Sequence, residues 1–110
     1  MTINEYQKLA MRTANDLPPV QLMANGVLGL CGESGEVADI VKKHLFQGHP
    51  LDKDHIASEL GDICWYLAIT AESIGYDLET VMAKNIEKLK KRYPQGFDSE
   101  RSLHRSEKDL

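Results

Sequence analysis

Residues 19–74 read PVQLMANGVLGLCGESGEVADIVKKHLFQGHPLDKDHIASELGDICWYLAITAESI, and this stretch predicts two long helices separated by a short break. Apolar residues recur at helical spacing on both sides of the Gly-His-Pro break at 48–50. We expect the first helix over about 19–46 and the second from Asp52 or Asp54 to Ile74. So short a connection favours an antiparallel helical hairpin.

The flanking sequence predicts two further helices and no sheet. Thr2 and Glu5 have the spacing of a capping box, and the helix that they open must end before Pro18-Pro19. Asp77 is the expected cap of a fourth helix over 78–92. No stretch alternates apolar and polar residues with the period of a strand. We therefore predict an all-α fold, a four-helix, up-down, bundle-like protomer.

The length of 110 residues fits one domain, which we place at 1–97, followed by a polar tail at 98–110. We expect this tail to be frayed or disordered, unless it packs on a neighbouring subunit. Only 6% of the residues are aromatic, which predicts a thin core. A chain with a thin core is expected to associate with further copies of itself.

Charge and composition exclude several classes of protein. The net charge of −4 argues against a general nucleic-acid binder, and the apolar run 63–69 is too short to span a membrane. No secretory signal is visible, and two cysteines are too few for a disulfide scaffold. We expect a reduced, cytoplasmic protein. The four histidines show no metal-ligand spacing and are expected at the surface or at helix ends: His44, His49, His55 and His104.

Two pairs of acids carry the chemistry that the sequence suggests. Glu33 and Glu36 lie three residues apart on the first long helix, and Glu59 and Asp62 on the second. Glu33 and Glu59 fall beside apolar stripes, and a hairpin would bring the four acids together. Carboxylates that close repel unless a cation lies among them, and carboxylate oxygens suit Mg²⁺, Mn²⁺ or Ca²⁺. The alternatives are a shifted helix phase or a wet groove between subunits.

Glycines recur every third residue of the first long helix, at Gly26, Gly29, Gly32 and Gly35. Each is expected to cost about 0.5–1 kcal/mol of helix stability relative to alanine. Close approach of another helix would explain them, and so would room for a ligand beside the acids. The sequence leaves both explanations open.

Trp65 and a basic segment on the fourth helix are candidates for nucleotide contacts. Trp65 would stack on a base, or it is an ordinary core tryptophan. Lys84 and Lys88 share a helix face, with Asn85 and Arg92 beside them, which suits either a phosphate clamp or a solvated surface. Acids for a metal, an aromatic for a base and a clamp for phosphates together suggest a nucleoside triphosphate ligand.

The motif Glu33-Ser34-Gly35-Glu36, 22 residues, then Glu59-Leu60-Gly61-Asp62 resembles the signature of the MazG-like all-α nucleoside triphosphate pyrophosphohydrolases. Three further segments are similar to that family: ICWYL at 63–67, KNIEKL at 84–89 and RYPQGF at 92–97. The resemblance covers about residues 3–97.

The resemblance implies a helical bundle that forms a homodimer or homotetramer and hydrolyses the α–β phosphate bond of (deoxy)nucleoside triphosphates. The products would be a monophosphate and pyrophosphate, in a house-cleaning role. It implies Mg²⁺, or alternatively Mn²⁺, on Glu33, Glu36, Glu59 and Asp62. Glu36 or Glu33 would orient or deprotonate the attacking water. The residues that it places near substrate are Lys84, Asn85 and Lys88, with Trp65 and Arg92 as weaker candidates.

Other functions remain open at this level. A relative could act on phosphoribosyl-ATP or on a single nucleotide such as dUTP or dCTP. A second class is a non-catalytic, nucleotide-binding regulatory bundle that keeps the metal site. A third is a purely structural interaction module.

Overall fold

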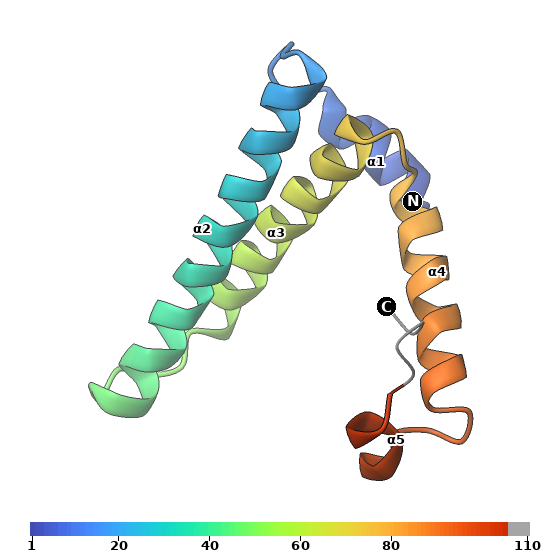
Figure 1. The fold of residues 1–110 in the computed structure, drawn as a ribbon. Coiled ribbons are helices and arrows are strands. Elements are labelled where there is room, and N and C mark those ends of the chain that lie inside the picture. The colour runs from blue at the N-terminus through green and yellow to red at the C-terminus, as the bar shows by residue number, and fades with distance from the viewer. Residues whose placement is uncertain (106–110) are drawn as a thin grey trace. The chain divides into compact units, whose positions relative to one another are not determined.

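The computed structural model describes residues 1–105, and over that range the protein is helical, as the sequence predicts. The elements are α1 (Ile3–Met11), α2 (Pro19–Phe46), α3 (Lys53–Ser73), α4 (Leu78–Arg92) and α5 (Ser99–Leu103) (Figure 1). The only β-type pairing within residues 1–105 is an isolated bridge between Pro94 and Gly96. The all-α prediction is therefore confirmed.

Local signals set the helix ends. Thr2 Oγ1 accepts a hydrogen bond from the Glu5 amide at 3.1 Å, so Thr2 is the N-cap of α1. Asp52 does the same for α3, since its Oδ1 accepts from the His55 amide at 3.0 Å. Gly75, just past α3, has a φ of 78°, which side chains other than glycine rarely adopt. Thr2 is thus the predicted capping residue, and α3 begins within the predicted range of Asp52 to Asp54.

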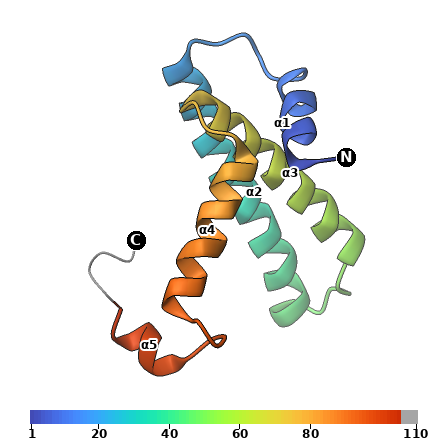
Figure 2. The same cartoon turned by 90° about the vertical axis from the view of Figure 1, so that its right-hand side faces the viewer.

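The chain divides into two compact units, 1–78 and 79 onward, each described by itself. In the first unit, α2 and α3 run antiparallel and side by side as the predicted hairpin (Figures 1 and 2). α1 packs against α3. The second unit holds α5 and all but the first residue of α4.

The core of the first unit is small, in line with the few aromatic residues. Its buried cluster consists of three alanines and one leucine: Ala10, Ala68, Ala71 and Leu78. Ile69 is the largest fully buried side chain of the described residues. None of the helices in residues 1–105 is both long and apolar enough to cross a membrane.

Gln7 links α1 to the segment between α3 and α4. Its side chain is only 4% exposed; Nε2 donates to the Tyr76 carbonyl at 3.0 Å and Oε1 accepts from the Leu78 amide at 2.6 Å. Both polar atoms of the buried amide are thus paired, as burial requires. Gln7 also satisfies the first amide of α4, which lacks a partner within its own helix.

The predicted polar tail contains α5 and the residues around it. Asp98 Oδ1 accepts from the Glu100 amide at 2.9 Å and starts this helix. The Arg101 guanidinium donates to the carbonyls of Lys91 and Arg92, which ties α5 to the end of α4. Residues 106–110, the last part of the expected tail, lie outside the described residues.

Candidate metal centre

Two glycines set how closely α2 and α3 approach. A Cβ atom added to Gly26 would collide with Thr70, and one added to Gly29 would collide with the Tyr66 ring. Nothing lies within 4 Å of a Cβ added to Gly32 or Gly35. Close packing therefore explains Gly26 and Gly29, whereas Gly32 and Gly35 face open space, and room for a ligand there stays a prediction.

The contact between Gly29 and Tyr66 also sets which residues of α2 and α3 lie opposite one another near the acids. Since Gly29 meets Tyr66, the next turn of α2 brings Glu33 to the level of Asp62 and Glu59 on α3. One carboxylate oxygen from each of these three residues lies within 4.8 Å of the other two. Glu33 and Glu59 are partly buried, whereas Asp62 is exposed. Three of the four predicted ligands thus converge.

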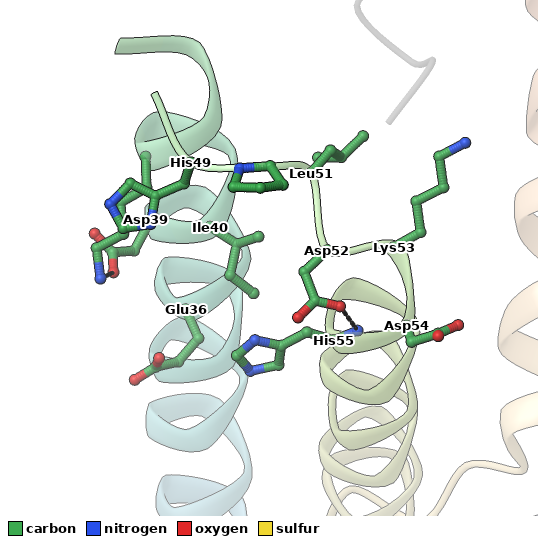
Figure 3. Close-up of a pocket in the computed structure, with 11 residues that line it drawn as sticks. Glu36, Asp39, Ile40, His49, Leu51, Asp52, Lys53, Asp54 and His55 are labelled. Atoms are coloured by element: carbon green, nitrogen blue, oxygen red, sulfur yellow. Dashed lines mark hydrogen bonds and ion pairs between the residues drawn. The ribbon is translucent and has the colours of Figure 1, made fainter. Parts of the chain in front are cut away.

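Glu36 does not belong to that group of three oxygens. It is exposed, one turn further along α2, and lines an open pocket of about 870 Å³ at the end of the hairpin (Figure 3). Its charge nevertheless contributes to the raised pKa of Glu33, so it lies close enough to interact with the cluster.

Glu33 shows the electrostatic cost of the cluster. Its pKa is raised from 4.5 to about 7, first by hydrogen bonding to the Glu59 carboxyl, then by burial and by the charges of Glu59, Asp62 and Glu36. Within residues 1–105, Glu33 Oε2 is a buried atom that accepts no hydrogen bond. A buried acceptor without a donor, among like charges, is what a cation would satisfy.

The raised pKa predicts how pH affects the metal-free protein. Between pH 4.5 and about 7 the folded state keeps a proton on Glu33 that the unfolded state releases. The unfolded state binds fewer protons there, so stability is expected to fall as pH rises through this window. Melting temperatures measured in EDTA across the window test this.

A Glu33→Gln variant should lose that part of the pH dependence, because glutamine carries no titrating proton. Glu72→Gln, which removes an exposed carboxylate from the same hairpin, is the control and should keep it. Parallel pH curves for the wild type and Glu33→Gln would contradict the assignment.

His55 is a contact of the cluster that sequence reasoning missed. Its Nε2 lies 3.2 Å from Glu59 Oε1, one helical turn along α3. We expected a surface or helix-end histidine, and His55 does lie in the first turn of α3. The signal that could have found it is its spacing of four residues before Glu59, which puts the two side chains on one face.

Trp65 lies between α1 and α3. Its Nε1 donates to the Ala10 carbonyl at 3.1 Å and to Thr13 Oγ1 at 2.9 Å. The indole packs against the buried cluster and meets the Tyr66 ring edge-on, with centroids 5.1 Å apart. These contacts supply the core role that the sequence left open; base stacking by Trp65 stays a prediction.

The basic segment lies on α4, in the second unit. Lys84 and Asn85 are exposed there, and Lys88 and Arg92 are partly buried. Each is placed within its own unit only, so the phosphate contacts expected of these four residues stay a prediction.

Comparison with known proteins decides the family. Residues 23–97, well over half of the chain, match the family model described as the MazG nucleotide pyrophosphohydrolase domain. The chain belongs to the MazG family. The matched range includes the three converging carboxylates and Glu36, so the resemblance seen in the sequence motifs is confirmed.

A relative of this MazG-family chain is the "Gene 37 protein" of Mycobacterium phage L5. The two are 33% identical over 105 residues, which cover 87% of this chain and 92% of the phage protein. No solved structure matches the chain significantly.

Proposed function

We propose that this MazG-family protein is a Mg²⁺-dependent pyrophosphohydrolase that cleaves the α–β phosphate bond of (deoxy)nucleoside triphosphates in a house-cleaning role. The observation that carries the proposal is the convergence of Glu33, Glu59 and Asp62 within 4.8 Å, with an unpartnered buried oxygen on Glu33. The family supports the reaction class, since its domain is described as a nucleotide pyrophosphohydrolase.

The donor set fits a hard divalent cation. Glu33, Glu59 and Asp62, joined by Glu36, would hold Mg²⁺ or Mn²⁺ through carboxylate oxygens. When bound, the cation would offset the negative charge of the triphosphate and lower the pKa of a water molecule. None of the donors is a thiolate or imidazole, which zinc would favour.

The remaining chemistry falls to the side chains. The oxygen of a water molecule forms a bond to phosphorus, and the bond from that phosphorus to the oxygen that bridges the α- and β-phosphates breaks. The products are a monophosphate and pyrophosphate. Glu36 or Glu33 would take the proton of the attacking water. Lys84, Asn85, Lys88 and Arg92 would contact the phosphates, where positive charge stabilises the charge that develops on oxygen.

A product assay tests the reaction. The protein is incubated with each canonical ribo- and deoxyribonucleoside triphosphate and MgCl₂, and the products are separated by anion-exchange chromatography. We expect monophosphate and pyrophosphate in equal amounts, and none when EDTA replaces Mg²⁺. Nucleoside diphosphate and orthophosphate would contradict the proposed bond cleavage.

The same assay separates the alternatives. Turnover of phosphoribosyl-ATP alone, or of dUTP or dCTP alone, would narrow the substrate to that compound. Mg²⁺-dependent nucleotide binding with no turnover would indicate a regulatory bundle instead.

The active form is proposed to be a homodimer or homotetramer. Large apolar side chains along α2 are exposed, among them Val20 and Leu28 at 72% each and Phe46 at 80%. Exposed apolar side chains of this size on one helix are suited to packing against a second copy.

A further inference from the structure

His55 is the side chain whose contact with the carboxylate cluster the proposed chemistry leaves unused. It approaches Glu59 with Nε2 3.2 Å from Oε1. An ionised carboxylate only accepts hydrogen bonds, so the imidazole donates through its Nε2–H when it bonds to an ionised Glu59. The contact then holds one oxygen of Glu59.

The backbone of His55 is held in place by the N-cap of α3. The His55 amide donates to Asp52 Oδ1 at 3.0 Å, which closes the first turn of α3. His55 and Glu59 are then one turn apart on a continuous helix. Side chains at this spacing meet on one face of a helix, so the helical backbone itself places the two side chains within hydrogen-bonding distance.

Burial is uneven across the pair. The Glu59 side chain is 15% exposed and that of His55 is 50% exposed. The imidazole thus lies on the solvent side of a mostly covered carboxylate. In Figure 3 its ring extends from α3 into the space between the two helices, where it lines the pocket together with Glu36 of α2.

We propose that His55 is a positioning residue for the metal centre: it holds the Glu59 carboxylate in the orientation that binds Mg²⁺. This inference rests on the proposed function, because Glu59 must be a ligand for its orientation to matter. Partners that orient metal-binding side chains in this way contribute about 10–100-fold to metal affinity.

The test compares Mg²⁺ binding by calorimetry and Mg²⁺-dependent turnover at a fixed pH. His55→Phe keeps a ring of similar shape and removes the donor, and we expect its Kd for Mg²⁺ to rise about 10–100-fold. His55→Gln restores an N–H donor and should recover part of the loss. His49→Phe is the matched control: His49 lines the same pocket, and this substitution should leave the Kd unchanged.

Turnover separates positioning from a direct role in the reaction. At saturating Mg²⁺, kcat of His55→Phe should return close to the wild-type value, while the Mg²⁺ concentration for half-maximal rate rises in step with the Kd. A kcat that stays low at saturating Mg²⁺ would overturn the positioning role.

The inference and the proposed function fail in different ways. If the wild type binds Mg²⁺ and hydrolyses nucleotides, but His55→Phe binds Mg²⁺ equally well, His55 does not position Glu59 and the metal centre stands. If the wild type binds no Mg²⁺ and turns over no nucleotide, the proposed function is wrong and the inference falls with it.

Discussion

Glu59→Gln is expected to reduce Mg²⁺-dependent turnover at least about 100-fold, above the usual effect of residues that only orient a metal ligand. Glutamine has nearly the same shape as glutamate, so the hairpin should keep its packing. The substitution removes one carboxylate from the three-carboxylate cluster. Initial rates of pyrophosphate release over a range of Mg²⁺ concentrations measure the loss.

The same variant should lose activity without losing stability in the absence of metal. Without metal, the loss of one negative charge relieves repulsion with Glu33 and Asp62, so the melting temperature in EDTA should not fall. We expect Mg²⁺ to raise the melting temperature of the wild type, and this increase should be absent in Glu59→Gln. Glu72→Gln, on the same helix and exposed, should behave as the wild type in both assays. Full activity of Glu59→Gln would remove Glu59 from the metal centre.

Gly29→Leu is expected to destabilise the protein by about 3 kcal/mol, the upper end of the usual cost of overpacking. Even a Cβ atom at this position would collide with the Tyr66 ring, so a leucine requires the ring, the helices or both to shift. Urea denaturation, followed by circular dichroism, measures the change in the free energy of unfolding.

Gly32→Leu is the matched control, one turn along the same helix. Nothing lies within 4 Å of a Cβ at Gly32, so a side chain added there starts in open space. Leucine favours the helical state over glycine, and we expect a gain of about 0.5–1 kcal/mol. Equal losses for the two variants would show that glycine content alone, and not the contact with Tyr66, sets the stability.

The helices could be predicted from the sequence because their signals are local. Proline, glycine and capping residues lie within a few positions of the ends that they set, as Thr2 and Asp52 show. The hairpin followed from the short break between two long helices, and the acid cluster followed from the hairpin. Each of these inferences needs only helical periodicity and chain connectivity.

Contacts between distant residues could not be predicted in this way. The bond from the Leu78 amide to Gln7 joins residues 71 positions apart, and no short-range pattern marks it. Helical periodicity places Glu36 one turn from Glu33 on α2, but it does not determine which of the four carboxylates come together. The contact of His55 with Glu59 is local, because the two residues lie four positions apart on one helix face, but that spacing is not a metal-ligand pattern.

The bonds that α1 makes have a consequence for where this protein can be cut. The family match begins at residue 23, yet Trp65 and Leu78, inside the match, hydrogen-bond to Ala10, Thr13 and Gln7, outside it. A fragment trimmed to the conventional domain boundary would lose the acceptors of the indole and expose the alanine-rich core. We therefore expect a fragment of residues 23–97 to be less stable than the full chain, because it lacks these hydrogen-bond acceptors.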